Sequence, residues 1–268
     1  MKYIYFCAMM ETLQELRQFF DSGYKEYRPD ITIDCAIFGY HDGKLQLLLV
    51  KNKILTLWCM PGGYVKKSET LHEASARITL ERTGIGNLFL KQFKTFGDPG
   101  RNQAYGVFDP EKLYEISGIR IPEDSWLLSQ TVSVGFYAIT DIFKATPKAD
   151  ILSSECRWFP IDEIPHLGFD HDDMVREALF TMRMHLHHFP VGKNLLPRKF
   201  TLRDIKQLYE VMSGKSLHAT NFPNKLIKIG LIDRLEEKKR IGAHRSPTYY
   251  RFNDEIYEKA LKEGLVVV

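Results

Sequence analysis

A run of residues from Gly63 to Ile85 combines a glycine turn with charged side chains at helical spacing. Residues at positions i, i+3 and i+4 of a helix share one face, and counted from Ile78 these positions are Ile78, Glu81 and Arg82. Three carboxylates placed there would form a site for Mg²⁺, which prefers oxygen ligands in octahedral geometry. Here only Glu81 is acidic, while Arg82 adds a cation that repels a divalent ion. The sequence therefore predicts weak magnesium binding or none.

The spacing of this run resembles the Nudix box, GX5EX7REUXEEXGU. The matching positions are Gly63, Glu69, Arg77, Glu81, Gly84 and Ile85. The departures are Ile78 and Arg82, at two metal-binding glutamates of the box, and Thr79, at an apolar position. The resemblance implies a Nudix fold without pyrophosphate hydrolysis, so we expect no catalytic residue, no metal and no cofactor. The alternative is a helix that merely follows a glycine turn.

A Nudix fold still has a pocket, and we expect its rim to come from the paired strands, the glycine turn and the loop after Phe96. Asp34 is either a carboxylate of this pocket or a polar group at the edge of the sheet. Trp58 either stacks on a ligand or fills the core. The candidate ligand-binding residues are Asp34, Lys51, Trp58, Glu69, Arg77, Asp98 and Arg101.

The remaining candidates have alternative roles of their own. Lys51 ends a strand, and Asp98 and Arg101 lie in the loop FKTFGDPGR, so each either contacts a ligand or is simply solvated. Glu69 and Arg77 either contact a ligand or pair with each other. We favour the pair, because it would fix the loop that enters the helix.

The C-terminal segment has the pattern of two helices joined by a tight turn. One face of TLRDIKQLYEVMSG carries the apolar residues Leu202, Ile205, Leu208, Tyr209 and Met212. After Gly214, SLHATNFPNKLIKIGLI predicts a second, short helix. Its start is expected near Thr220 or Asn221, because Pro223 fits only the first turn of a helix. Such an arrangement is a helix-turn-helix.

Two apolar strands, LIDRLEE and SPTYYRF, flank the basic tip KKRIGAHR and predict a wing. Cations at a hairpin tip suit the DNA backbone or minor groove. The second helix would enter the major groove by its N-terminal end, where asparagine can read adenine. The alternative is a solvated hairpin on a small protein-binding domain. The predicted DNA-binding residues are Lys215, Thr220, Asn221, Asn224, Lys225, Lys228, Lys238, Lys239, Arg240, His244 and Arg245.

The charge of the chain is distributed unevenly. Residues 193–268 contain 16 Lys and Arg against 9 Asp and Glu, a net charge of +7. Residues 1–192 contain 21 against 25, a net charge of −4. A basic C-terminal part behind an acidic body indicates a polyanionic partner, or else ordinary surface charge.

Mixed strands around one central helix must position the box, and they predict an α+β domain. The strands are expected in ITIDCAIFGYHDGKLQLLLVKN, with a His-Asp-Gly turn in its middle, in LWCMPGG and in ECRWFPIDEIP, and at residues 89–96 and 131–140. The central helix is expected over residues 68–83 with Ser68 as its N-cap. Residues 105–130 are expected to form an inserted helix and loop.

Two further helical stretches frame this domain. Residues 11–20 predict a short amphipathic helix, and Pro29 ends the lead-in segment that contains it. Residues 169–188 predict a linker helix. The prolines and glycine of FPVGKNLLPRKF mark a boundary. We therefore expect a lead-in (1–28), a Nudix-like effector-binding and dimerisation domain (29–166), a linker helix (167–195) and a winged helix-turn-helix domain (196–268).

The composition of the 268-residue chain, with 44% hydrophobic and 26% charged residues, is typical of a globular protein. No apolar run approaches the roughly 18 residues of a membrane helix, so we expect no membrane partner. The cysteines, Cys7, Cys35, Cys59 and Cys156, form no CxxC pair and indicate a reducing compartment. We expect a cytoplasmic protein.

Taken together, a degraded Nudix box before a winged helix resembles the Nudix-related transcriptional regulators of the NrtR type, over residues 30 to about 252. Such proteins are dimeric bacterial repressors, of which some respond to ADP-ribose in NAD metabolism and others to pentoses. Overall likeness and the lost glutamates favour the arabinose-responsive branch. The resemblance implies a homodimer that binds double-stranded operator DNA and a small effector, a pentose or ADP-ribose.

The rival hypothesis is an enzyme. In it, Glu69, Glu81 and Glu73 would hold a metal in an atypical Nudix site, and the chain would hydrolyse ADP-ribose or a related nucleoside diphosphate. The C-terminal unit would then serve for recruitment.

Overall fold

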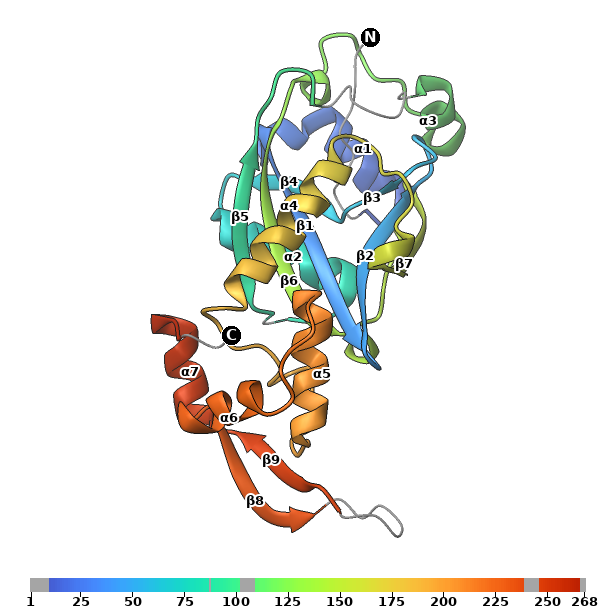
Figure 1. Ribbon diagram of the computed structural model, residues 1–268. Coiled ribbons are helices and arrows are strands. Elements are labelled where there is room, and N and C mark those ends of the chain that lie inside the picture. Colours follow the sequence, from blue (N-terminus) through green and yellow to red (C-terminus); the bar gives the residue numbers. More distant parts are fainter. Residues whose placement is uncertain (1–9, 87, 102–108, 239–245, 266–268) are drawn as a thin grey trace. The chain divides into compact units, whose positions relative to one another are not determined.

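The computed structural model describes residues 10–86, 88–101, 109–238 and 246–265 (Figure 1). The chain divides into two compact units. The first comprises Met1–Gly39 and Gln46–Leu179, and the second comprises Tyr40–Leu45 and Phe180–Val268.

The first unit is built on a seven-stranded sheet with the order β3-β2-β1-β6-β5, in which β4 also pairs with β1 and β7 with β2. The strand β1 begins before Pro29, which we expected to end the lead-in segment; a proline is tolerated near the start of a strand. The strands are β1 (Tyr27–His41), β2 (Lys44–Asn52), β3 (Trp58–Cys59), β4 (Gly62–Lys66), β5 (Leu90–Phe96), β6 (Val132–Asp141) and β7 (Ser153–Pro160).

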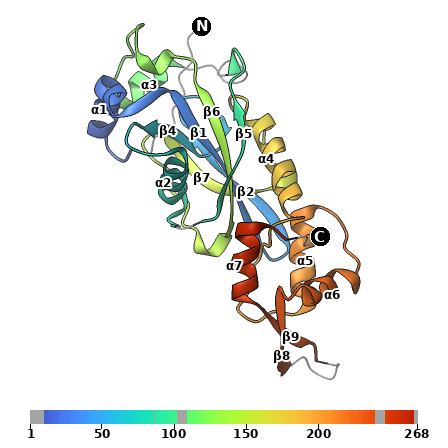
Figure 2. The ribbon, with the colours of Figure 1, turned by 90° about the vertical axis from the view of Figure 1, so that its left-hand side faces the viewer.

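Two helices cover opposite faces of this sheet: α2 (Leu71–Thr83) and the start of α4 (His171–His185) (Figure 2). Alternate side chains of β1 pack against different helices, because neighbouring side chains of a strand point to opposite faces of the sheet. Ile33 and Cys35 share a core with Ala74 and Ile78 of α2. Asp34, between them, points the other way, to the face where His171 of α4 contacts it.

The helix α2 begins at Leu71, so the expected N-cap at Ser68 is wrong. Thr70 caps the helix instead. Its side chain accepts a hydrogen bond from Glu73 N–H at 3.2 Å, and Glu73 accepts one from Thr70 N–H at 2.8 Å. This reciprocal capping box satisfies two backbone donors of the first turn. Gly84, with φ 72°, ends the helix in the left-handed conformation that glycine tolerates best.

The N-terminal helix α1 (Leu13–Ser22) lies at the expected place and belongs to the core of the first unit. Phe19 packs edge-on against Trp126 at 5.1 Å between ring centroids, and Trp126 packs against Tyr64 of β4 at 5.0 Å. Trp126 belongs to the expected insertion, whose helix is α3 (Pro110–Ser117). Lead-in and insertion therefore pack together beside the glycine turn.

The second unit has the predicted helix-turn-helix followed by a β-hairpin. Buried side chains of the helices and the hairpin, among them Tyr209, Phe222, Leu226 and Tyr250, form its core. The C-terminal helix α7 was not predicted from the sequence. The elements are α5 (Leu202–Ser213), α6 (Asn221–Lys228), β8 (Ile232–Lys238), β9 (Thr248–Phe252) and α7 (Asp254–Glu263). Within the described residues, no helix is long and apolar enough to cross a membrane.

Candidate functional site

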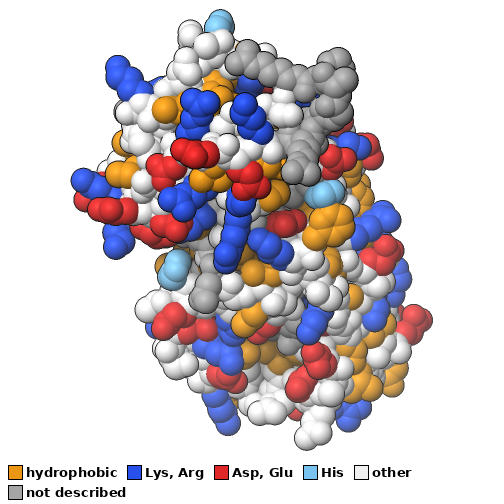
Figure 3. All heavy atoms as spheres, turned by 90° about the horizontal axis from the view of Figure 1, so that it is seen from below, with side chains coloured by type: hydrophobic (Ala, Val, Ile, Leu, Met, Phe, Trp, Pro, Cys, Tyr) orange, Lys and Arg blue, Asp and Glu red, His pale blue; other side chains and the backbone are white. Residues whose placement is uncertain are grey.

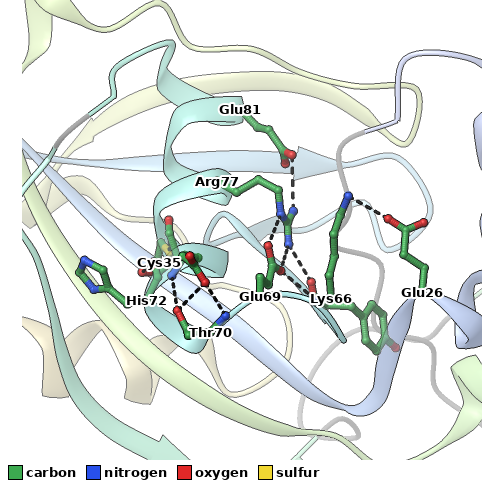
Figure 4. Close-up of polar contacts among 11 residues, drawn as sticks. Glu26, Cys35, Lys66, Glu69, Thr70, His72, Arg77 and Glu81 are labelled. Carbon is green, nitrogen blue, oxygen red and sulfur yellow. Dashed lines mark hydrogen bonds and ion pairs between the residues drawn. The ribbon is translucent and has the colours of Figure 1, made fainter.

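At the Nudix box, the Arg77 guanidinium lies between the two remaining carboxylates (Figure 4). Its Nη2 and Nε donate to the two oxygens of Glu69 at 2.7 and 3.1 Å, and its Nη1 donates to Glu81 at 3.4 Å. Nη2 also donates to the Tyr64 carbonyl at 3.0 Å, and Glu69 accepts a hydrogen bond from Lys66 N–H at 2.8 Å. The expected Glu69–Arg77 pair is present, and it ties α2 to β4.

The ionisation of these groups follows from their surroundings. Burial opposes the charge of Glu69, but its bonds from Arg77 and from the Lys66 N–H lower the pKa of this carboxyl below its usual value. Burial dominates at Glu81 and raises its pKa, although Arg77 attracts the charge. Burial also opposes the charge of Arg77, yet the two carboxylates raise its pKa, so it stays a cation.

The two departures from the Nudix box have structural roles. Ile78 is 1% exposed and packs in the core between α2 and the sheet. Arg82 is 4% exposed, and its Nη2 pairs with Asp150 at 2.7 Å while its Nη1 donates to the Lys148 carbonyl at 3.3 Å. The sequence predicted that Arg82 places a cation near Glu81, and the structure adds that Asp150 pairs with this guanidinium.

The donor set does not fit the magnesium ion that the Nudix box implies. Ile78 is aliphatic and Arg82 is a cation paired with Asp150, so only Glu81 offers a carboxylate at the three positions that share this face of the helix. Glu73, the third ligand of the rival hypothesis, caps α2 instead. Among the described residues, no three His, Cys, Asp or Glu side chains form a group that could hold a metal ion.

A second polar cluster lies buried on the opposite face of the sheet. Arg101 donates to both oxygens of Asp170 at 2.8 and 2.9 Å, and its Nη2 lies 3.8 Å from Asp34. Ser133 donates to Asp34 at 2.5 Å, and His171 Nε2 lies 3.4 Å from the same carboxylate. The sheet-edge alternative for Asp34 is excluded, because β1 lies between β2 and β6. The solvated alternative for Arg101 is wrong too, because this side chain is 1% exposed.

Charge compensation keeps Asp34 ionised in this cluster. Burial opposes its charge, but His171, Arg101 and Ser133 together hold the pKa of this carboxyl below its usual value. Asp34 raises the pKa of His171 against burial, yet His171 Nδ1 accepts a hydrogen bond from Met60 N–H at 2.9 Å, which requires this nitrogen to carry no proton. We therefore take the ring as neutral, with its single proton on Nε2, the nitrogen that faces Asp34.

Lys51 and Trp58 meet in a stack on the sheet. Lys51 Nζ lies 5.4 Å from the Trp58 ring centroid, and the Arg157 guanidinium lies 4.8 Å from it. Phe159 packs edge-on against Trp58 at 4.7 Å between centroids. Trp58 is 7% exposed and therefore fills the core, which was one of the two roles expected from the sequence. Asp98 is exposed, and its backbone carbonyl accepts hydrogen bonds from Arg101 N–H and from the Gln130 side chain.

The predicted ligand residues do not converge on one place. Glu69 and Arg77 belong to the α2 face of the sheet, whereas Asp34 and Arg101 contact residues at the start of α4. Sequence reasoning missed Asp170, His171 and Ser133. The stretch LGFDHDDMV carried the only signal, a cluster of acidic residues and a histidine at the start of a helix.

A cavity of about 440 Å³ lies beside the Nudix box loop. Its lining includes Phe19 of α1, Tyr27 of β1 and Lys66 of β4. Lys66 forms an ion pair with Glu26 at 2.9 Å across this lining, and Glu15 adds a second carboxylate. The cavity is thus polar, with charges of both signs, and it contains none of the residues predicted to bind the ligand.

The predicted DNA-binding residues that the structure describes are mainly exposed to solvent. Thr220, Asn221, Asn224 and Lys228 of the α6 region are exposed, and Lys225 is half-buried. Lys215 and Lys238 are exposed as well. The other predicted wing residues, Lys239, Arg240, His244 and Arg245, lie outside the described residues. Figure 3 shows a face on which Lys and Arg side chains are interspersed with Asp and Glu.

The fold and the box define a Nudix-fold domain followed by a winged helix domain. Residues 30–178 match the family model described as the NUDIX domain, and residues 192–252 match the model described as the NrtR DNA-binding winged helix domain. Because the first match spans more than half of the 268 residues, the chain belongs to the Nudix family.

Three known proteins are similar over much of the chain. The ADPR responsive transcriptional repressor NtrR of Acinetobacter baylyi is 27% identical over 237 residues, 86% of this chain and 84% of the relative. The ADP-ribose pyrophosphatase of Methanocaldococcus jannaschii is 24% identical over 158 residues, 58% of this chain and 78% of the relative. The crystal structure of Shewanella oneidensis NrtR complexed with a 27mer DNA has a TM-score of 0.63 at 22% identity and covers 85% of this chain and 95% of that chain.

Proposed function

We propose that this protein is a ligand-responsive transcriptional repressor that binds DNA through its winged helix and an effector through its Nudix domain. The observation that carries the proposal is the loss of two metal-binding glutamates of the box: Ile78 packs in the core, and Arg82 pairs with Asp150 at 2.7 Å. The exposed polar face of α6 in the same chain supports the DNA-binding role. The similar Acinetobacter protein is named as a transcriptional repressor, in agreement with this role.

The Nudix domain is proposed to recognise its ligand without hydrolysing it. At two positions where the box has metal-binding glutamates, Ile78 offers no ligand and Arg82 is a cation paired with Asp150. The rival activity is hydrolysis of ADP-ribose, which the name of the Methanocaldococcus relative favours. Release of AMP from ADP-ribose in the presence of Mg²⁺ would identify that activity.

ADP-ribose is the first proposed effector, since the Acinetobacter relative is named as responsive to it. The cavity beside Lys66 supports a second candidate, a pentose such as L-arabinose. Lys25 and Lys66 face Glu15 and Glu26 on its lining, so the charges balance and suit an uncharged ligand with many hydroxyl groups.

The helix α4 is proposed to transmit effector binding. Its first turn follows Asp170, which Arg101 holds from the loop after β5, and the helix continues past Leu179 into the second unit. An effector shifts an equilibrium only if it prefers one arrangement, and a nearly complete switch needs several kcal/mol of difference in affinity. A two-fold homodimer would place two winged helices on two half-sites of an operator.

Fluorescence anisotropy on DNA tests the proposal. A labelled 30-bp duplex, selected by the protein from a random pool, is titrated with the full chain alone and with ADP-ribose or L-arabinose. We expect binding that weakens with salt and that one of the two ligands reverses. Failure to retain any duplex, or rapid turnover of ADP-ribose that Glu81→Gln abolishes, would contradict the proposed function.

A further inference from the structure

The turn before α6 contains a histidine that caps the helix. His218 Nδ1 accepts hydrogen bonds from Thr220 N–H at 3.3 Å and from Asn221 N–H at 3.2 Å. Thr220 occupies the N-cap position, but within the described residues its side chain makes no capping hydrogen bond. His218 therefore does what a capping side chain does, from two residues further back.

The same geometry sets the state of the imidazole. A ring nitrogen can accept a hydrogen bond only when it carries no proton. Because His218 Nδ1 accepts two, the ring is neutral and its proton lies on Nε2. A second proton on Nδ1 would break both bonds and bring a positive charge to the positive end of the helix dipole.

The other backbone donors of the first turn are also used within the chain. Phe222 N–H donates to the His218 carbonyl at 3.4 Å, and Asn224 N–H donates to the Thr220 carbonyl at 3.1 Å. Pro223 has no N–H to offer. Helices that bind phosphate at their N-termini do so through unsatisfied backbone N–H groups. In α6 these groups are engaged from Thr220 to Asn224, which leaves DNA recognition to side chains.

The loop that leads to His218 is anchored at its other end by Glu210 of α5. Glu210 accepts hydrogen bonds from Leu217 N–H at 2.8 Å and from the Ser216 hydroxyl at 3.3 Å, and it pairs with Lys206 at 2.6 Å. The turn between α5 and α6 is thus held by one side chain at each end. Rotation of α6 about its start would break the His218 bonds.

We propose that His218 is a positioning residue for DNA recognition, which fixes the N-terminal turn of α6 so that the side chains of Thr220, Asn221 and Asn224 face the bases. This inference rests on the proposed DNA-binding function. It assigns the backbone of that turn no phosphate contact, and it gives the neutral imidazole the role that asparagine or aspartate has in other helix caps.

The test compares His218→Ala with His218→Asn in the full chain. Asparagine can accept hydrogen bonds from the N–H groups two and three residues ahead, whereas alanine cannot. Affinity is measured by anisotropy, over a range of salt concentrations, for the duplex selected by the wild-type protein and for a scrambled duplex of equal composition. Circular dichroism and thermal unfolding establish that each variant is folded.

We expect His218→Ala to bind the selected duplex roughly fivefold to tenfold more weakly, because binding must then also order the uncapped first turn of α6. Its affinity for the scrambled duplex and its salt dependence should change little, because no phosphate contact is removed. His218→Asn should recover most of the loss. In the wild-type protein, NMR of the imidazole nitrogens should find the proton on Nε2.

Three results would overturn the proposal: unchanged affinity in His218→Ala, equal losses in both variants, or equal losses on both duplexes with a flatter salt dependence. The last would make His218 a direct phosphate contact. If the wild-type protein retains no duplex at all, the proposed function fails, and that outcome is distinct from any difference between the variants.

Discussion

Arg82 and Asp150 form a buried ion pair, with Nη2 and Oδ2 2.7 Å apart and with 5% and 2% of the two side chains exposed. Arg82 stands where the Nudix box has a metal-binding glutamate. The neighbouring backbone reinforces the pair, because Thr146 N–H donates to the Thr83 carbonyl and Lys148 N–H donates to the Arg82 carbonyl. The C-terminal end of α2 is therefore held against residues 146–150. The arginine that replaces a metal-binding glutamate of the box thus stabilises the fold.

Restoring the glutamate should consequently damage the protein instead of reviving an enzyme. Arg82→Glu leaves Asp150 buried beside a like charge, and breaking a buried pair costs about 3–5 kcal/mol. All three tryptophans, Trp58, Trp126 and Trp158, belong to the first unit, so their fluorescence in urea reports its unfolding. The charge exchange Arg82→Glu with Asp150→Arg should recover part of the loss. A stable single variant that hydrolyses ADP-ribose with Mg²⁺ would refute this reasoning.

Arg77→Lys tests whether the geometry of the guanidinium matters at the box. A lysine keeps the charge but cannot donate at once to Glu69, Glu81 and the Tyr64 carbonyl. We expect a loss of about 1–3 kcal/mol in the stability of the first unit, from hydrogen bonds to charged groups. The control is Arg176→Lys, whose side chain is 71% exposed and whose replacement should cost less than about 0.5 kcal/mol. Equal effects at the two positions would show that charge alone suffices.

The resemblance to the Nudix box predicted the Nudix fold, and local pattern predicted the helix-turn-helix, because glycine turns and helical spacing act over a few residues. The turn between β1 and β2 and the start of α6 at Asn221 were confirmed on that basis. The partners of the charged side chains could not be predicted in this way. Asp150 lies 68 residues from Arg82, and Asp170 lies 69 residues from Arg101, so only the folded sheet brings them together.

The candidate ligand site was predicted less well for a related reason. A strand shows that Asp34 faces away from Ile33, but it does not show which helix covers that side. The start of α4 covers it, and the pairs formed there remove Arg101 from solvent. The cavity beside Lys66 is lined partly by α1, which the sequence presented only as a lead-in.

Asp34→Asn should reveal how strongly the buried cluster depends on its charge. The folded pKa of Asp34 is lowered, so the ionised carboxylate stabilises the protein above its unfolded pKa of about 3.9, and this contribution is lost as pH falls through the folded value. At pH 7 the variant should lose about 3 kcal/mol, because Arg101 and His171 lose a buried partner.

Urea unfolding of wild type and variant at pH 7, 5 and 3 measures this dependence, again by tryptophan fluorescence. The difference in stability should be largest at pH 7 and should shrink below pH 4, as the wild-type carboxyl takes up a proton. Asp98→Asn, at an exposed loop position, provides the control and should change stability little at any pH. A difference that stays constant with pH would mean that Asp34 contributes through its hydrogen bonds alone.

Lys228 and Lys238 should contribute to DNA binding through their charge, without distinguishing one DNA sequence from another. Both are exposed, one on α6 and the other at the end of β8. If each contacts a phosphate, Lys228→Ala with Lys238→Ala should weaken binding to every duplex. The slope of log affinity against log salt concentration should fall in magnitude by about 0.9 per lysine. Lys259→Ala with Lys262→Ala, on exposed positions of α7, removes the same net charge and serves as the control. An equal change of slope in both double variants would show that net charge, and not the face formed by α6 and the wing, determines affinity.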